Sequence, residues 1–258
     1  MYGALLGVAF FVFGAIVGSF LNVLILRRGV FTLGGRSMCL SCSSPLKWYD
    51  LVPIGSFILL RGRCRKCAAK ISYQYPIVEI LSGLTFLMLY LRSLAPLAFA
   101  ISLVFWHSLL CIAAYDFRHT IIPDEFVFAA IAAGFFSLFV TSTDALVLPS
   151  ILQILTGFGL AFFFFAFWFL SEGRLMGLGD SKLALAIGWF LAPGTALTAL
   201  FVSFWAGAFA GVALMAFSRL HRLSGTGNGH TLKSEIPMAP FLVFGAALVY
   251  FGSISLFS

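Results

Sequence analysis

Eight long apolar runs constrain the fold of this 258-residue chain more than any other feature of its sequence. An α-helix needs about 20 predominantly apolar residues to cross a bilayer, with a range of roughly 17 to 25. We therefore predict an all-α polytopic membrane protein with about eight transmembrane helices, of which the second, fourth and sixth are short. The predicted spans are 4–26, 77–91, 95–115, 126–141, 146–170, 182–192, 195–218 and 239–257.

The composition also indicates a membrane protein. Hydrophobic residues make up 61% of the chain and charged residues only 10%, whereas about one quarter of a soluble domain is charged. The first apolar run ends in Arg27-Arg28 and has no small-residue cleavage site after a basic start. We therefore interpret it as a retained first span and not as a removed signal peptide.

The basic residues predict the orientation, because cytoplasmic loops carry an excess of lysine and arginine. With eight spans and the N-terminus outside, every lysine and arginine except Arg92 falls in an inside loop. We therefore expect a multi-pass protein whose inside loops face the cytoplasm. This topology and attraction to anionic lipid account for the net charge of +7, so no nucleic-acid partner is predicted.

Residues 27–76, between the first two spans, contain two Cys-x2-Cys pairs. Twenty-one residues separate the pairs, which is close to the spacing of four-cysteine zinc sites. About fifty residues cannot bury much core, so a structural zinc would stabilise this insert. Two disulfides or four free thiols are the alternatives, and a reducing cytoplasm disfavours the disulfides. The predicted zinc ligands are Cys39, Cys42, Cys64 and Cys67.

A second segment outside the predicted spans covers residues 219–238. It is basic and rich in glycine, and it lacks the spacing of a phosphate-binding loop. We interpret it as a solvated loop.

Two aspartates, Asp116 and Asp180, lie at the ends of apolar runs on the predicted inside face. Ionisable groups at membrane depth are costly and usually mark function. Asp116 ends the third run, where the helix dipole disfavours a carboxylate, so an ion pair with Arg118 or a chemical role is needed to explain it. Asp180 follows Gly177-Leu-Gly179 and begins the sixth run, where an ordinary N-cap is the alternative explanation.

Two carboxylates that meet are equipped for acid–base hydrolysis. Like charges disfavour double ionisation, so one carboxylate activates a water as general base while the other donates a proton. Gly177 and Gly179 would let a backbone or a substrate strand approach closely. The chain has no G-x-S-x-G elbow and no H-E-x-x-H motif. His107 and Cys111, in the third run, are expected to be interior packing residues.

Taken in order along almost the whole chain, these motifs resemble the type IV prepilin peptidases, bifunctional leader peptidases and N-methyltransferases of bacterial inner membranes. Gly177-Leu-Gly179-Asp180 matches the G-x-G-D motif of this aspartyl-protease class, and Asp116, 64 residues earlier, lies where the partner aspartate belongs. The double Cys-x2-Cys is similar to the cytoplasmic insert of the family. The other similar segments are Gly18-Ser-Phe-Leu-Asn-Val23, Leu46-Lys-Trp-Tyr-Asp-Leu-Val-Pro53, Leu60-Arg-Gly-Arg-Cys64 and Ile71-Ser-Tyr-Gln-Tyr-Pro-Ile-Val-Glu79.

The resemblance implies that Asp116 and Asp180 cleave prepilin or pseudopilin leaders after a glycine, on the cytoplasmic side of a bacterial inner membrane. It also implies methylation of the new N-terminal residue with S-adenosylmethionine, for which Glu79 and the cysteine insert are the candidate features. The corresponding organisation is a first span at 1–26, a zinc-knuckle insert at 27–76 and a multi-span aspartyl-peptidase core at 77–258.

One segment departs from the family, since Pro237-Met-Ala-Pro240 stands where relatives often read Pro-Phe-Gly-Pro. Two other functions are consistent with parts of the pattern. An ion-coupled transporter would place acids nearer mid-span and break its helices in paired halves. A peptidase without methyl transfer would keep the aspartates and lack the second activity. The sequence predicts neither the individual substrates nor the oligomeric state.

Overall fold

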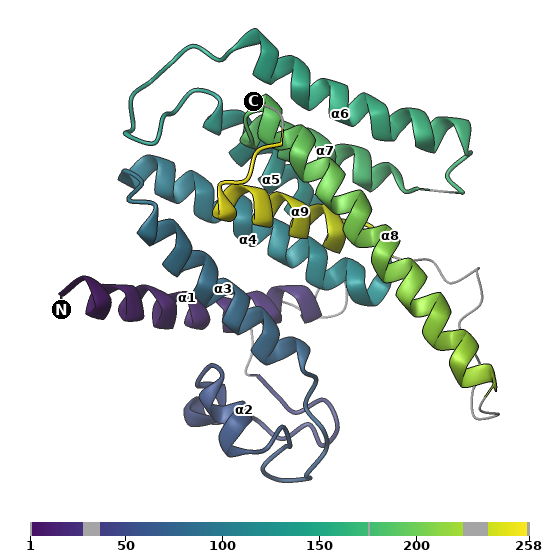
Figure 1. Cartoon of the computed structure of the whole chain (residues 1–258). Coiled ribbons are helices and arrows are strands. Elements are labelled where there is room, and N and C mark those ends of the chain that lie inside the picture. The colour runs from purple at the N-terminus through teal and green to yellow at the C-terminus, as the bar shows by residue number, and fades with distance from the viewer. Residues whose placement is uncertain (1, 28–36, 175, 224–236, 257–258) are drawn as a thin grey trace.

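The computed structural model describes residues 2–27, 37–174, 176–223 and 237–256 (Figure 1). Apart from three isolated β-bridges, the secondary structure of these residues is helical, which confirms the predicted all-α fold. The elements are α1 (Tyr2–Arg27), the 3-10 helix η1 (Trp48–Leu51), α2 (Gly55–Leu59), α3 (Gln74–Leu91), α4 (Pro96–His119), α5 (Asp124–Ser137), α6 (Ile151–Leu170), α7 (Leu178–Phe190), α8 (Pro193–Leu223) and α9 (Ala239–Gly252).

Each of the eight predicted spans corresponds to one helix, but their lengths differ. Among the described residues, five helices are long and apolar enough to cross a bilayer, namely α1, α3, α4, α6 and α8. The helices α5, α7 and α9 contain 14, 13 and 14 residues, which is short of the usual spanning length. Five candidate spans are therefore established by length, and a count of eight is not.

The long helix α8 shows that the predicted start of the following loop, at residue 219, was wrong. It continues to Leu223, so the predicted loop at 219–238 begins as helix. Residues 224–236 of that loop lie outside the described residues.

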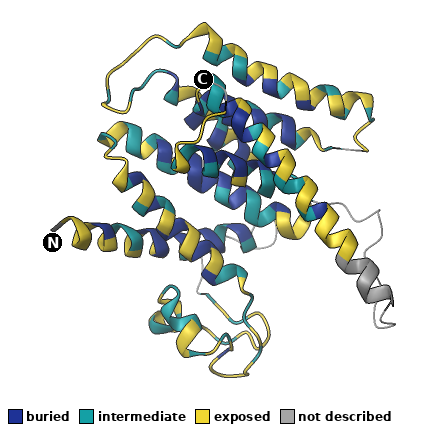
Figure 2. Ribbon diagram, in the orientation of Figure 1, coloured by how far each residue is buried: buried dark blue, intermediate teal, exposed yellow. Residues whose placement is uncertain are grey.

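The central helix is α4, which packs against α3, α5 and α9 (Figure 1). Helix α1 pairs with α3, α7 packs against both α5 and α6, and α8 packs on α9. Buried side chains concentrate where α4, α5, α7 and α9 meet (Figure 2). By contrast, only 17% of the apolar stretch of α6 and 11% of the apolar stretch of α8 is buried inside the protein. Their exposed apolar faces suit lipid, whose tails are as apolar as leucine side chains.

Close helix contacts occur at glycines, because a missing Cβ lets two backbones approach. A Cβ on Gly18 of α1 would lie 2.8 Å from the Cα of Glu79 in α3. A Cβ on Gly134 of α5 would lie 2.8 Å from the carbonyl oxygen of Ala186 in α7. The α6–α7 contact is also tight, since a Cβ on Gly157 would overlap the indole ring of Trp189.

Replacing Gly157 with alanine should lower the free energy of unfolding by about 1–3 kcal/mol, because the buried Trp189 ring has to move. Equilibrium unfolding in detergent would measure this change. Gly159→Ala is a matched control on the same helix, since nothing lies within 4 Å of its added Cβ. The control should be neutral or stabilising, because alanine is favoured over glycine in a helix by about 1 kcal/mol. Equal stability of the two variants would contradict this packing.

A buried polar group links α1, α3 and α4 inside the helical bundle. The Ser82 hydroxyl donates to the carbonyl oxygen of Gly14 at 2.6 Å and lies 3.0 Å from Nε2 of His107. Nδ1 of His107 lies 2.8 Å from the carbonyl oxygen of Leu103. Both ring nitrogens of His107 are therefore engaged, as expected for an interior histidine.

Candidate active site and metal centre

Asp116 lies in the last turn of α4 and is buried, with 4% of its surface exposed. Its Oδ2 accepts a hydrogen bond from the backbone N–H of Ala239, at the start of α9, at 3.2 Å. The helix ends at His119 and is capped by Thr120, which adopts a left-handed conformation with φ of 50° and donates its N–H to the carbonyl oxygen of Asp116. Among the described residues Asp116 forms no ion pair with Arg118. That alternative explanation for its position is therefore not supported.

Asp180 lies in the first turn of α7 and is also buried, with 6% of its surface exposed. It is not the N-cap that the sequence offered as an alternative. Gly177 occupies the cap, and its N–H donates to Oδ2 of Asp180 at 3.2 Å. The other oxygen, Oδ1, is buried and has no hydrogen-bond partner among the described residues. A buried carboxylate oxygen without a hydrogen-bond partner is unfavourable. A water or a substrate that donates a hydrogen bond to this oxygen would remove that cost.

The structure brings the two aspartates into electrostatic reach of each other, since the charge of Asp116 acts on Asp180. They enter the site from opposite helix ends, the C-terminus of α4 and the N-terminus of α7. Gly179 makes this approach possible, because a Cβ there would lie 2.8 Å from Cβ of Ile122 in the turn that follows α4. The first turn of α7 can therefore lie directly against the segment that follows Asp116.

Sequence reasoning missed one group that holds a candidate catalytic residue and one surface ion pair between two helix starts. The first is Ala239, whose backbone N–H holds Asp116. The sequence pattern that could have indicated it is the Pro237–Pro240 segment, which contains the start of α9. The second is the ion pair of Lys182 with Asp124 at 2.7 Å, which ties the start of α7 to the start of α5. Asp124 itself is an exposed surface acid, with 60% of its side chain accessible.

The four predicted zinc ligands come together in the insert. The Sγ atoms of Cys39, Cys42, Cys64 and Cys67 all lie within 4.8 Å of one another, and those of Cys39 and Cys67 are 3.8 Å apart. Tetrahedral zinc with Zn–S bonds of about 2.3 Å places sulfurs about 3.8 Å apart. The donor set and its geometry therefore fit a structural zinc ion. None of the four cysteines forms a disulfide, so the disulfide alternative is not supported.

Two similar knuckles hold these cysteines. In the first, Cys39 N–H donates to the carbonyl oxygen of Ser44, and in the second, Cys64 N–H donates to that of Ala69. Hydrogen bonds from the hydroxyl and backbone N–H of Ser44 lower the pKa of the Cys42 thiol to about 6. A lowered thiol pKa favours the thiolate, which is the form that binds metal.

Glu79 lies at the junction of the insert and the helical bundle. Only 7% of its surface is exposed. Its Oε2 accepts a hydrogen bond from the backbone N–H of Ile54 at 2.7 Å. Ile54 has a φ of 61°, which is strained for a β-branched residue. Glu79 thus holds a strained turn of the insert against α1 and α3.

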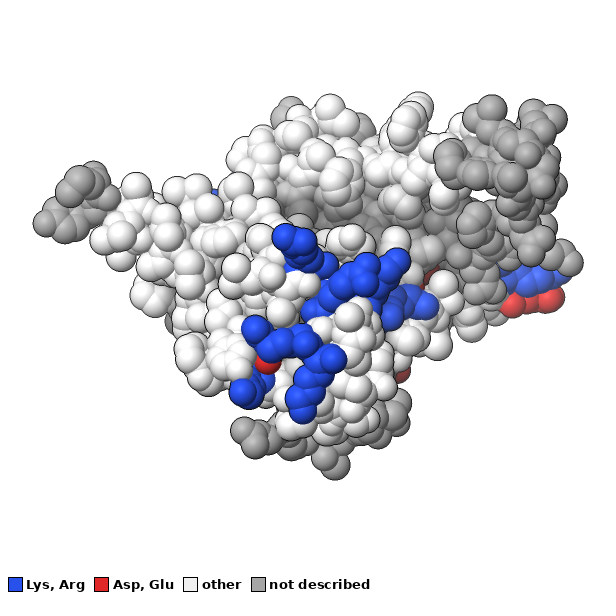
Figure 3. Space-filling model, turned by 90° about the horizontal axis from the view of Figure 1, so that it is seen from below, with Lys and Arg blue, Asp and Glu red and all other residues white. Residues whose placement is uncertain are grey.

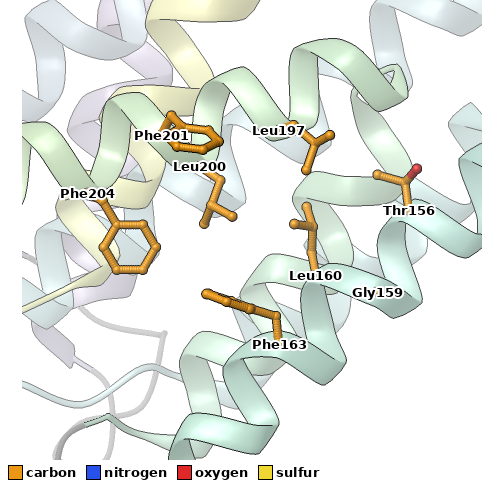
Figure 4. A pocket seen from close by; sticks show the side chains of 8 residues that line it. All are labelled: Thr156, Gly159, Leu160, Phe163, Leu197, Leu200, Phe201 and Phe204. Atoms are coloured by element: carbon orange, nitrogen blue, oxygen red, sulfur yellow. The ribbon is translucent and has the colours of Figure 1, made fainter. Parts of the chain in front are cut away.

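A cavity of about 480 Å³ between α6 and α8 lies apart from these groups (Figure 4). Its lining contains no ionisable side chain and therefore offers no acid–base chemistry. The lining residues are Thr156, Gly159, Leu160, Phe163, Leu197, Leu200, Phe201 and Phe204.

Comparison with known proteins supports one family along most of the chain. Residues 12–93 match the family model "Bacterial Peptidase A24 N-terminal domain", and residues 101–212 match "Type IV leader peptidase family". No solved structure matches.

Curated relatives agree with the family models. A prepilin leader peptidase/N-methyltransferase of Aeromonas hydrophila is 30% identical over 95% of this chain and 91% of the relative. One of Myxococcus xanthus is 33% identical over 83% of this chain, although the match spans only 64% of that protein. A type 4 prepilin-like proteins leader peptide-processing enzyme of Escherichia coli is 31% identical over 74% of this chain and 79% of the relative. With both halves of the chain matched and the aspartates, glycines and cysteines arranged as described, this chain belongs to the type IV leader peptidase family.

Proposed function

We propose that this protein is an intramembrane aspartyl endopeptidase that cleaves the leader of prepilin-like proteins after a glycine. The observation that carries the proposal is the buried pair of Asp116 and Asp180, in which one oxygen of Asp180 has no partner among the described residues. The names of the relatives supply the substrate class.

The pair suits hydrolysis through a single water molecule. One carboxylate removes a proton from the water, and the water oxygen adds to the peptide carbonyl carbon. The other aspartate, in its protonated form, donates a proton to the carbonyl oxygen. Transfer of a proton to the amide nitrogen then breaks the C–N bond. The hydrogen bonds from Gly177 and Ala239 each occupy one oxygen of an aspartate and hold its orientation, which leaves the second oxygen for the chemistry.

The proposed topology has eight spans, with the site and the cysteine insert on the cytoplasmic side of a bacterial inner membrane. The short helices α5, α7 and α9 would cross by local thinning of the bilayer and by leaning on the longer helices around them. The pattern of basic loops supports this sidedness. The pair lies at helix ends and no mid-span pair of acids accompanies it in the described residues, which favours a peptidase over an ion-coupled transporter.

We further propose that the protein methylates the new N-terminal residue, with S-adenosylmethionine as the methyl donor. We also propose that residues 27–76 form a unit stabilised by zinc, beside the first span (1–26) and the peptidase core (77–258). Oε2 of Glu79 is already engaged by the backbone N–H of Ile54. We therefore assign Glu79 as a positioning residue that holds the insert in place, and not as a direct ligand of the donor.

Glu79→Gln should lower methyl transfer by about tenfold or more while leaving cleavage nearly unchanged, because it weakens a charge-assisted hydrogen bond to Ile54 that lies apart from the aspartate pair. The ratio of methylated to unmethylated cleaved product, followed by mass spectrometry, measures this. The Ser72 hydroxyl accepts a hydrogen bond from the nearby Gln74 N–H, so Ser72→Ala offers a control. Equal loss of both activities in Glu79→Gln would show that the residue supports the whole fold.

The function itself is tested by incubating the detergent-solubilised protein with a purified prepilin and S-adenosylmethionine. Mass spectrometry should find a product that lacks the leader and carries one methyl group on its new N-terminus. A cleaved but unmethylated product would reduce the function to that of a peptidase. An intact prepilin would reject the proposal.

A further inference from the structure

We propose that the insert docks on the bilayer through an exposed basic and apolar surface that binds anionic phospholipid headgroups. We call it the insert surface and define it by Lys47, Trp48, Ile58, Leu59, Arg61 and Arg63. The proposal concerns where the insert lies, so it stands or falls independently of the peptidase activity.

The first argument is depth. The backbone N–H of Ile54 is bonded to Glu79, which lies one turn inside α3. Glu79 in turn packs against Gly18 of α1. Gly18 lies nine residues before the end of α1 at Arg27, or about 13 Å along the axis at 1.5 Å per residue. The headgroup region on each side of a bilayer is only about 5–8 Å thick. With Arg27 at the membrane surface, as the predicted first span implies, Ile54 is held at or within that surface.

The second argument is the exposed apolar side chains next to Ile54. It is followed directly by α2, whose last two residues, Ile58 and Leu59, are 67% and 83% exposed. Trp48 is 79% exposed. Exposed apolar groups of this size are unfavourable in water, and tryptophan is enriched where headgroups meet acyl chains. A membrane interface accommodates these groups.

The third argument is charge. Lysine and arginine side chains gather on the face of the molecule that carries the insert, with little acid among them (Figure 3). Residues 37–73 contain one acid, Asp50, which is already paired with Arg65 at 2.9 Å. The exposed basic side chains of the insert are Lys47, Arg61, Arg63, Arg65, Lys66 and Lys70. Near an anionic bilayer each such residue strengthens binding roughly fivefold.

The test places the full-length protein in nanodiscs of brominated phosphatidylcholine, with or without phosphatidylglycerol. Bromine quenches tryptophan fluorescence at short range, and the difference between wild type and Trp48→Phe isolates the signal of Trp48. We expect Trp48 to be quenched strongly in the anionic discs and less in the zwitterionic discs. Arg61→Glu should reduce the docked fraction in anionic discs, shifting the docked-to-undocked ratio by roughly tenfold or more.

Arg174→Glu is the matched control. Arg174 lies between α6 and α7, and its side chain is 77% exposed, so the substitution makes the same charge change away from the insert. The control should leave the quenching of Trp48 as in wild type. Leu59→Ser tests the apolar part and should weaken quenching in both lipids. Zinc content should be unchanged in every variant, which excludes unfolding of the knuckles as the cause.

Three results would overturn the proposal. Equal quenching in both lipids, unaffected by Arg61→Glu, would remove the anionic headgroup as the partner. Absence of quenching in either lipid would mean that another part of this chain covers the surface. Quenching that appears only after a prepilin is added would assign the surface to the substrate.

Discussion

Asp116→Asn and Asp180→Asn should each reduce prepilin cleavage by roughly 10²–10⁴-fold or more, because each removes one of the two groups that move protons in the reaction. An asparagine has nearly the same shape and keeps an oxygen for the bond from Ala239 or Gly177. The variants should therefore remain folded. The measurement is the initial rate of leader removal from a detergent-solubilised prepilin, with thermal unfolding of each variant as the check on folding.

Asp124→Asn is the control for this experiment. Asp124 is an acid on the same predicted membrane face, but it is exposed and paired with Lys182. Exposed ion pairs contribute about 0–1 kcal/mol, so this variant should cleave at close to the normal rate. If either Asp116→Asn or Asp180→Asn retains near-normal cleavage while Asp124→Asn loses it, the pair has been assigned wrongly and Asp124 takes the place of the dispensable residue.

Removal of metal should have the second large effect, confined to the insert. Structural zinc supplies roughly 10–16 kcal/mol of apparent folding free energy in zinc-finger peptides, and the insert has few buried side chains of its own. Chelation of zinc, or Cys64→Ser, should therefore unfold residues 37–73. The helices α4 to α9 pack in a separate core and should keep their structure. Hydrogen–deuterium exchange of the full-length protein would show fast exchange in the insert and unchanged protection in that core.

Cys111→Ala is the matched control for the cysteine substitution. Cys111 is a buried packing residue of α4, with 1% of its surface exposed. Its loss should leave the zinc content and the protection of the insert as in wild type. Unchanged exchange in the insert after complete loss of zinc would show that the four thiols are dispensable for its structure.

Much of the fold could be predicted from the sequence, because long apolar runs have few structural options. The eight runs correspond to the eight helices of the bundle, and the cysteine spacing predicted the cluster of four thiols that could hold a metal ion. The ends of the helices were less predictable. Asp116, predicted at the C-terminus of the third span, lies in the last turn of α4, which continues through His119 because Thr120 is the first residue in a left-handed conformation.

The proximity of Asp116 and Asp180 depends on tertiary packing and not on any local property of the sequence. The sequence predicts only that both lie on one side of the membrane, 64 residues apart. Their proximity depends on how α4, α5, α7 and α9 pack, and on Gly179 lying against Ile122. The bond from Ala239 to Asp116 joins residues 123 positions apart. No local pattern specifies such a contact.

The sequence by itself determined the class of fold, the chemistry of the candidate groups and the four cysteines that cluster, because hydrophobic length, residue type and short-range spacing are local properties. Only the tertiary structure decided that both carboxylates are buried with the charge of Asp116 acting on Asp180, that one oxygen of Asp180 has no partner among the described residues, and that Glu79 holds the insert against the first and second candidate spans. These depend on the packing of distant helices, whose close contacts are set by the shapes of both surfaces together.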